Sequence, residues 1–218
     1  MKDSTGISMS VIRRLPRYYQ YLTDLSNNGI ERITSSELAE KMGLTASQIR
    51  QDFNCFGGFG LQGYGYNTKQ LANALAGIMG LDSDFSAILI GAGNLGRAVA
   101  AHLFSEQNGF KLIAVFDSDK KLEGKKVGKF SVMHMDALED FCRENKPVTA
   151  VLCVPDEAAK EVALKLDSLG VKSFWNFSHF DISSILPNSR VENVHLKDSL
   201  MTLCFLIKSD MEKNKEKH

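Results

Sequence analysis

Ser86-Ala-Ile-Leu-Ile-Gly-Ala-Gly-Asn-Leu-Gly-Arg-Ala-Val-Ala100 is the stretch that decides the fold of this chain. Its apolar run ends in a Gly-x-Gly-x-x-Gly motif, and a helical pattern begins directly after it. A second apolar run ends in Asp117, 21 residues after the last glycine of the motif. An apolar strand, a glycine turn, a helix and a distant acid together form the dinucleotide-binding fingerprint of a βαβ unit.

The glycine motif predicts how a pyrophosphate is held. Gly91 makes the tight turn, Gly93 lets the backbone approach the phosphates, and Gly96 lets the helix pack close to the strand. Backbone N–H groups and the helix N-terminus supply the anion site, because they carry partial positive charge. The predicted pyrophosphate loop is Gly91, Ala92, Gly93, Asn94, Leu95 and Gly96.

Asp117 predicts which nucleotide binds. An acid at the end of the second strand accepts a hydrogen bond from the ribose 2′-OH and repels a 2′-phosphate, which favours NAD(H) over NADP(H). Asp119-Lys-Lys121 follows and would attract a phosphate, so this preference stays open. The alternative for Asp117 is a solvated loop acid.

After the glycine motif, the chain alternates strands with helices. Strands are expected at 86–90, 111–116, 149–154 and 172–176, and helices at 94–106, 136–145 and 156–169. This order predicts a Rossmann-like, doubly wound parallel sheet, which binds its ligand at the carboxyl ends of the strands. The further cofactor-binding candidates at strand ends are Val154, Pro155, Asn176 and Ser178.

The first 80 residues predict a different kind of domain. A helix is expected at 10–27, with one face formed by Ile12, Leu15, Tyr19, Leu22 and Leu25. Thr34-Ser-Ser-Glu37 is a capping box that opens a short helix ended by Gly43, and Thr45-Ala-Ser-Gln48 is a second capping box directly after it. Two short helices that meet at a glycine turn are typical of a helix-turn-helix.

The second helix of this pair has an apolar and a polar face. Ile49, Phe53 and Phe56 define the core face. Side chains of the kind that read base edges lie opposite, at Ser47, Arg50, Gln51 and Asn54. Arg50 and Gln51 are the main DNA-contact candidates, and Gln48 is a further one unless its side chain is spent on the cap. A capped helix pair alone more often reflects plain packing.

A glycine-rich segment strengthens the DNA-binding interpretation. Residues 56–66 predict a β-hairpin, the wing of a winged helix, with Gln62, Gly63 and Tyr64 at the tip reaching the minor groove. A helix is expected at 68–80, and Leu81–Asp84 forms the linker. Residues 1–80 hold only eight Lys/Arg against six Asp/Glu, so one domain should bind weakly, and a homodimer on an inverted repeat of double-stranded operator DNA is implied.

The C-terminal segment predicts an apolar helix that needs a partner. Leu196, Leu200, Leu203 and Ile207 form a stripe at helical spacing. Further apolar residues around the stripe are Met201, Cys204, Phe205 and Leu206. Burial against a second subunit is the expected solution. The expected domains are a winged-helix domain at 1–82, a Rossmann domain at 83–195 and a dimer helix with its tail at 196–218.

Composition excludes several classes of protein. The net charge of zero requires any nucleic-acid contact to come from local placement of charge. The four cysteines, at 55, 142, 153 and 204, are too far apart for a zinc motif or a disulfide framework, and we expect no metal site. Neither a membrane span nor a secretory signal is found, so the expected location is the cytoplasm. Cys55 is expected to be a small buried residue rather than a thiol sensor.

The histidines do not predict an enzyme. A dehydrogenase needs a general base facing the nicotinamide. None of the five histidines lies in a recognisable catalytic setting, and no substrate domain follows the Rossmann segment. We therefore expect no catalytic residues.

The chain resembles the Rex family of bacterial redox-sensing transcriptional repressors over about residues 8–208. The matching segments are Arg14–Tyr19, Ser35–Glu40, Gln48–Asp52, Phe56–Gly60, Gly63–Tyr66, Gly91–Gly96, Phe116–Asp119, Val154–Pro155 and Trp175–Ser178. The resemblance implies a homodimer with N-terminal winged helices, Rossmann domains and a last helix swapped into the partner. It also implies that NADH releases the protein from operators of fermentation and respiration genes, whereas NAD⁺ permits DNA binding.

The resemblance assigns switch residues and shows two departures. Arg14 is similar to the residue at an interdomain contact that changes with the ligand. Several relatives carry a Tyr near the position of His102 and an acid near that of His195, both close to the nicotinamide. Gln51 and Gln62 replace a Lys and an Arg of some relatives, so operator preference is expected to differ.

The sequence therefore predicts a dimeric, NADH-responsive repressor. A small NAD-dependent oxidoreductase with an N-terminal oligomerisation domain is the main alternative. A repressor that responds to another nucleotide, such as a coenzyme A derivative, is the third, although Asp117 favours a ribose diol.

Overall fold

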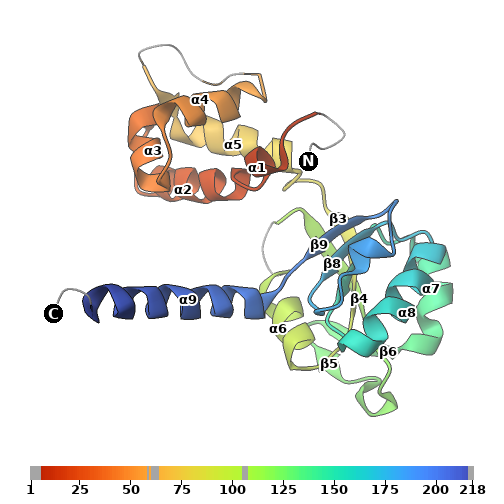
Figure 1. Ribbon diagram of the computed structural model, residues 1–218. Helices are drawn as coiled ribbons and strands as arrows, with labels where there is room; N and C mark the ends of the chain where they lie inside the picture. Colours follow the sequence, from red (N-terminus) through yellow and green to blue (C-terminus); the bar gives the residue numbers. More distant parts are fainter. Residues whose placement is uncertain (1–5, 58, 60–63, 105–107, 216–218) are drawn as a thin grey trace. The chain divides into compact units, whose positions relative to one another are not determined.

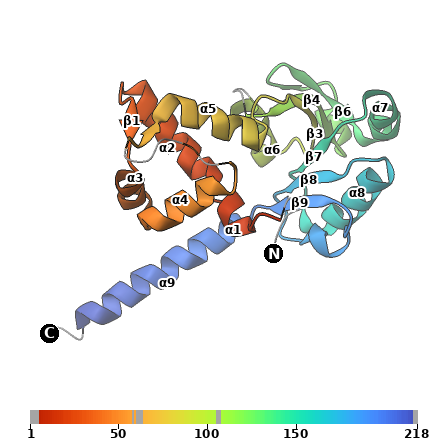
Figure 2. The same ribbon diagram turned by 90° about the horizontal axis from the view of Figure 1, so that it is seen from above.

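The computed structural model describes residues 6–57, 59, 64–104 and 108–215 of the chain. The chain clusters into two compact units, residues 1–83 and 84–218. Figures 1 and 2 show both units from two directions. Each unit has its own hydrophobic core and is described by itself.

The first unit is helical with one small sheet. Its elements are α1 (Met9–Ile12), α2 (Leu15–Asn27), β1 (Arg32–Ile33), α3 (Ser35–Met42), α4 (Ala46–Asn54), β2 (Tyr66–Asn67) and α5 (Thr68–Met79). β1 pairs with β2 in antiparallel fashion. The strand that follows the glycine-rich segment is therefore hydrogen-bonded to the strand that precedes α3. The core of this unit includes Leu22, Leu38, Ile49, Phe53 and Leu75.

The prediction of a single helix at 10–27 is wrong in one respect, because the helix is interrupted between α1 and α2. Pro16 is the second residue of α2 and has no N–H to continue the helical hydrogen-bond ladder. The buried tyrosine is Tyr18, fully covered, whereas Tyr19 is only partly buried. Spacings of three and four residues both fit a helical stripe, so the sequence could not choose between the two tyrosines.

The helix-turn-helix forms as its caps predict. Thr34 and Glu37 make the full capping box: the Thr34 N–H donates to Glu37 Oε2 at 2.7 Å, and the Glu37 N–H donates to Thr34 Oγ1 at 3.2 Å. Gly43 ends α3 in the left-handed region at φ 66°. Thr45 accepts from the Gln48 N–H at 3.2 Å, which is half of the second expected box.

The second unit is a three-layer α/β fold. Its first half contains β3 (Phe85–Ile90), α6 (Asn94–His102), β4 (Phe110–Asp117), η1 (Lys120–Leu122), β5 (Lys126–Val127), β6 (Phe130–His134), η2 (Met135–Ala137) and α7 (Leu138–Asn145). Its second half contains β7 (Thr149–Leu152), α8 (Asp156–Ser168), β8 (Ser173–Asn176), η3 (Ile182–Ser184), β9 (Arg190–Asn193) and α9 (Leu196–Lys215). The sheet order is β5-β6-β4-β3-β7-β8-β9, with β5 antiparallel and the other pairings parallel.

Alternation along β3 explains why helices cover both faces of the sheet. Ile88 and Ile90 pack into the core beneath α7 and α8, whereas Leu89 packs into the core beneath α6. Figure 1 shows these helices on opposite faces. The expected fold class, an N-terminal helix-turn-helix unit plus a Rossmann-like parallel sheet, is confirmed, whereas the exchange of the last helix between subunits stays a prediction. The strands β5, β6 and β9 were not expected from the sequence.

The last helix, α9, leaves the second unit as one straight element after β9 (Figures 1 and 2). Its apolar side chains are exposed, with Phe205 at 70% and Leu200 at 62%. A helix with this much exposed apolar surface indicates an interaction surface.

Candidate nucleotide and nucleic-acid interfaces

The glycine loop leaves no space for a side chain at two of its three glycines. Gly91 has φ +99°, and a Cβ there would lie 2.4 Å from the Cys153 carbonyl oxygen. A Cβ on Gly96 would lie 1.8 Å from the Gly91 carbonyl oxygen. Both glycines are therefore required by the fold itself.

Gly93 differs from its two neighbours in the motif. Its φ of −68° suits any residue, and a Cβ there would meet no described atom within 4 Å. Gly93 is also the N-cap of α6 and gives that helix no side-chain cap. The start of α6 therefore has no side-chain cap and has room beside Gly93, at the place where a pyrophosphate binds in this kind of fold.

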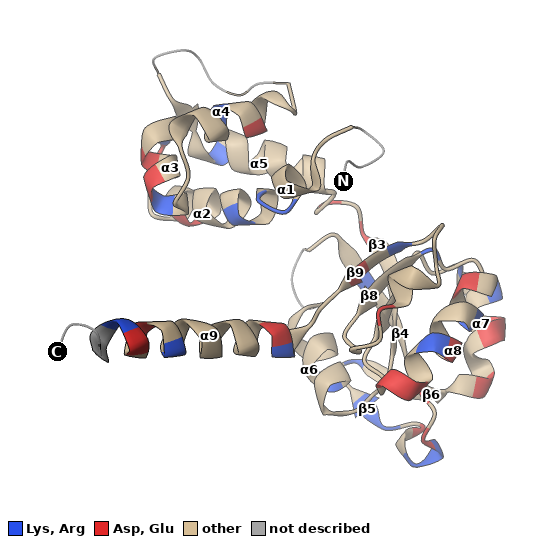
Figure 3. Cartoon of the chain, in the orientation of Figure 1, with Lys and Arg blue, Asp and Glu red and all other residues tan. Residues whose placement is uncertain are grey.

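Asp117 connects this loop to the next turn. Its Oδ2 accepts from the Ala92 N–H at 2.6 Å, and its Oδ1 accepts from the Asp119 N–H at 2.8 Å. The carboxylate therefore lies beside the glycine loop, as the fingerprint predicts. Lysines gather just beyond it, in η1 and β5 (Figure 3), and Lys120 and Lys121 are exposed.

The other cofactor candidates divide into two groups. Val154 adjoins the glycine loop, because its Cγ1 would lie 3.3 Å from a Cβ on Gly91, and Pro155 is the N-cap of α8. Asn176 and Ser178 are buried and bonded within the protein. The Asn176 amide donates to the Phe180 carbonyl at 2.8 Å, and Ser178 Oγ donates to Asn176 Oδ1 at 2.8 Å. These two side chains hold the turn that follows β8. Their direct contact with a cofactor stays a prediction.

The two histidine candidates lie at element ends of the second unit. His102 is exposed at the last position of α6. His195 lies between β9 and α9, and its ring stacks on that of His179, with centroids 6.1 Å apart and planes 8° apart. The Asp181 carboxyl lies nearby, and its pKa is lowered mainly by the hydrogen bond from Ser183 and to a smaller extent by His195.

The second helix of the helix-turn-helix, α4, is the predicted recognition helix and shows the expected two faces. Ile49 and Phe53 are buried, and Gln48 is half-buried. The exposed side chains are Ser47, Arg50, Gln51 and Asn54. Arg50 Nη1 donates to Ser35 Oγ, the first residue of α3, at 2.9 Å.

The predicted wing is only partly described. Tyr64 is 71% exposed, and its carbonyl accepts from Arg32 at 3.3 Å. Gln62 and Gly63 lie outside the described residues. Their DNA contacts therefore stay a prediction.

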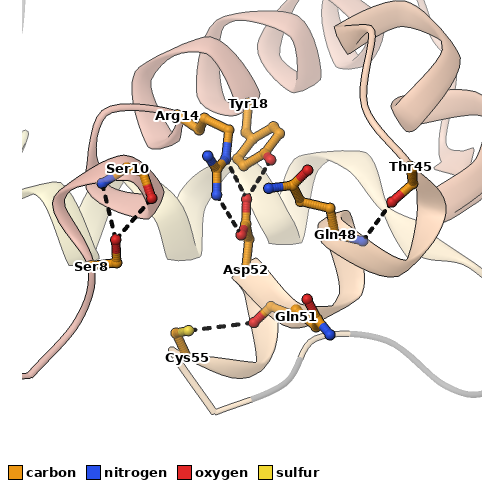
Figure 4. A network of polar contacts seen from close by, with 9 residues as sticks. All are labelled: Ser8, Ser10, Arg14, Tyr18, Thr45, Gln48, Gln51, Asp52 and Cys55. Carbon is orange, nitrogen blue, oxygen red and sulfur yellow. Dashed lines mark hydrogen bonds and ion pairs between the residues drawn. The ribbon is translucent and has the colours of Figure 1, made fainter.

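Two features of this unit differ from or go beyond the sequence prediction. Cys55 was expected to be buried and is exposed, because it continues the helical geometry of α4 and lies four residues after the exposed Gln51, whose carbonyl accepts from its Sγ at 3.4 Å. Asp52, which the sequence interpretation missed, is buried beside Arg14 and Tyr18 (Figure 4). Its spacing of three residues from Ile49 was the signal for a position on the core side of the helix.

Two kinds of feature are absent from the described part of the chain. No three His, Cys, Asp or Glu side chains gather there closely enough to hold a metal ion. None of its helices combines the length and the apolar character that a membrane crossing requires.

Comparison with known proteins decides the family. Residues 6–54 match the family described as "Putative DNA-binding protein N-terminus", and residues 82–180 match the one described as "CoA binding domain". The redox-sensing transcriptional repressor Rex of Clostridium perfringens is 46% identical over 95% of this chain and 97% of its own length. The one from Thermoanaerobacter pseudethanolicus is 48% identical over 96% and 93%. The chain belongs to the Rex family.

Solved structures agree with membership of the Rex family. RSP, described as a Rex-family repressor, matches with a TM-score of 0.88 and 45% identity over 97% of this chain and 99% of that one. RSP in complex with β-NAD⁺ and operator DNA matches with a TM-score of 0.88 and 47% identity over 97% of both chains. RSP in complex with β-NADH matches with a TM-score of 0.87 and 44% identity over 96% and 98%. The Rex relatives carry the names of repressors rather than of enzymes.

Proposed function

We propose that this chain is a redox-sensing transcriptional repressor, and not an enzyme, which binds operator DNA as a homodimer and leaves it when NADH binds. One observation carries the proposal. A single chain of the Rex family joins a helix with an exposed polar face to a glycine loop that has room beside Gly93 and no side-chain cap on the helix that follows. Because a repressor acts where its operator is, we place it in the cytoplasm.

The cofactor that fits the second unit is NAD(H). The Asp117 carboxylate beside the glycine loop is placed for the hydroxyl groups of an adenosine ribose and disfavours a phosphate at that end. A solved relative is described with both β-NAD⁺ and β-NADH, which supports the same nucleotide here. These two observations argue against a coenzyme A derivative, despite the printed description of the matching domain.

The partner surfaces are α4 and α9. Arg50, Gln51 and Asn54 point outward from α4 and can contact bases or phosphates in the major groove. The exposed apolar helix α9 supplies the homodimer contact, because burial against a second copy removes its side chains from water. Two copies place two recognition helices on an inverted repeat.

The mechanism we propose is linkage between the two sites. NADH can shift the DNA-binding equilibrium only by its difference in affinity for the two arrangements of the dimer. NADH and NAD⁺ differ at the nicotinamide ring, so that end must couple to the DNA-binding unit. We assign this coupling to His102 and His195 in the second unit and to Arg14 in the first.

A fluorescence-anisotropy titration tests the proposal. The probe is the operator DNA crystallised with the relative of 47% identity, and NADH or NAD⁺ is added to the bound complex. Release by NADH alone is expected. Binding that is indifferent to both nucleotides would discard the effector. Failure to bind the operator, together with turnover of NADH on small carbonyl compounds, would favour an oxidoreductase instead.

A further inference from the structure

The recognition helix carries a buried acid that DNA contact does not explain. Asp52 lies between the exposed Gln51 and the buried Phe53 and is only 3% exposed. A buried carboxylate is costly unless it is paired and hydrogen-bonded. Its presence on the helix aimed at DNA therefore calls for partners, and for a reason beyond packing.

The partners of Asp52 both come from the start of α2. Arg14 Nε donates to Asp52 Oδ2 at 2.7 Å, and Arg14 Nη2 donates to Oδ1 at 2.8 Å. The Tyr18 hydroxyl donates to Oδ2 at 2.6 Å. Figure 4 shows the guanidinium and the phenol converging on the carboxylate from α2. Both carboxylate oxygens are thus held, in a bidentate arrangement plus a third contact.

This geometry fixes the rotation of α4 about its own axis. A bidentate guanidinium–carboxylate pair is planar and directional, so it tolerates little rotation. The Tyr18 ring adds a second point of attachment, because it packs edge-on against Phe53 with centroids 5.2 Å apart. Arg50 and Gln51 precede Asp52 directly, so the contacts that fix Asp52 also fix the directions in which these two side chains leave the helix.

The two donors that hold Asp52 keep their protons. Its hydrogen bond to Asp52 raises the pKa of Arg14, and burial, followed by the bond to Asp52, raises the pKa of Tyr18. Arg14 therefore stays charged and Tyr18 stays protonated over the physiological range. The positive charge of Arg14 cancels a carboxylate that would otherwise repel DNA phosphates.

We propose that Asp52, held by Arg14 and Tyr18, is a positioning residue that aims the recognition helix at base edges and so sets the discrimination between operator and other DNA. The inference rests on the proposed DNA-binding function. It adds an indirect role, because Asp52 itself is buried and acts through the direction of Arg50 and Gln51.

The test compares Asp52→Asn with wild type in the full chain, on operator and on a scrambled duplex at the same salt concentration. Operator affinity is expected to fall roughly tenfold or more, because base contacts need exact direction, while affinity for the scrambled duplex changes less than about twofold. Arg14→Lys keeps the charge but removes the bidentate contact to Asp52. It should also lower the ratio of operator affinity to scrambled-duplex affinity. Asp167→Asn is the matched control: it breaks an ion pair with Lys172 in the second unit and should leave the ratio unchanged.

A merely structural role predicts a different result. The melting temperature would fall while the ratio of operator to scrambled affinity stays at the wild-type value, and that result overturns the proposal. A double-mutant cycle of Arg14→Gln and Asp52→Asn supplies a second measurement. Losses of operator affinity that simply add would also overturn it, because Arg14 would then act on its own.

Two further measurements distinguish a variant that fails to fold from a proposal that is wrong. If Asp52→Asn unfolds the unit, Tyr18→Phe retains the ion pair and removes one contact, and it should lower the ratio by about two- to fivefold. An unchanged ratio in a folded Tyr18→Phe would then count against the proposal. Failure of the wild-type protein to prefer the operator refutes the proposed function itself.

Discussion

The glycine loop and the recognition helix form their proposed binding surfaces in opposite ways. The loop at 91–96 presents backbone N–H groups, and two of its positions forbid any side chain because a Cβ would overlap neighbouring carbonyl oxygens. The helix α4 instead displays polar side chains and relies on a buried ion pair to direct them. The glycine loop depends on the absence of side chains, whereas α4 depends on side chains whose direction is fixed by the ion pair.

This difference teaches where each site should be vulnerable. A backbone site is specified by sterics, so a single methyl group can destroy it. A side-chain site is specified by direction, so it should lose specificity before it loses binding. The following predictions test these two statements, beginning with the largest expected effect.

Gly96→Ala should unfold or strongly destabilise the second unit, whereas Gly93→Ala should not. The added methyl group at Gly96 overlaps the Gly91 carbonyl oxygen, and we expect a loss of roughly 3 kcal/mol or more in unfolding free energy. At Gly93 the methyl group meets open space, so the loss should stay within about 1 kcal/mol. Thermal unfolding followed by circular dichroism measures both.

The same pair separates fold from function. Gly93→Ala should keep the fold yet weaken NADH binding by roughly tenfold or more, because the methyl group occupies the space that a pyrophosphate needs. Titration of NADH fluorescence measures this. Normal NADH affinity in a folded Gly93→Ala would show that the phosphates do not lie against this loop.

Asp117→Asn should weaken NADH binding by about ten- to a hundredfold, because a charge-assisted hydrogen bond to the ribose is worth roughly 1.5–3 kcal/mol. The amide keeps the size of the side chain and one acceptor oxygen. NADPH should discriminate further: its affinity should rise relative to that of NADH once the negative charge is removed. Equal losses for both nucleotides would mean that Asp117 only braces Ala92 and the turn at Asp119.

The sequence predicted the backbone site more fully than the side-chain site, for a physical reason. Gly91 and Gly96 follow a local steric rule, and the structure brings Asp117 to the loop as the fingerprint predicts. The Arg14–Asp52 pair joins residues 38 positions apart, and no local rule connects them. Cys55 was misplaced for a different reason: its neighbours Phe53 and Phe56 suggested burial, whereas its spacing of four residues from Gln51 puts it on the exposed face.

Two of the three missing strands, β5 and β9, have a separate explanation. β5 has two residues, and β9 alternates exposed with partly buried residues at the edge of the sheet. Neither has the apolar run that marks a central parallel strand. Edge strands of this kind are defined by the strand they pair with, which single-sequence patterns do not show.

Arg50→Ala tests whether displayed side chains carry operator affinity. We expect a loss of roughly ten- to a hundredfold on operator DNA at moderate salt, from one good base or phosphate contact. Arg143→Ala is the control: it removes an exposed arginine that pairs with Glu139 in α7. Wild-type affinity for Arg50→Ala in an anisotropy titration would remove this residue from the interface.

Cysteine alkylation gives the smallest and most local test of the comparison. Cys55 is exposed at the end of the recognition helix, whereas Cys153 lies against the glycine loop, where burial raises its pKa to about 12. Because the thiolate is the reactive form, Cys153 should stay unmodified by iodoacetamide from pH 7 to 9, and peptide mass spectrometry should find Cys55 modified before Cys153. Operator DNA should slow the modification of Cys55, because bound DNA covers this end of α4. Rapid labelling of Cys153 would mean that the backbone site opens as readily as the side-chain site, and the contrast between the two would fail.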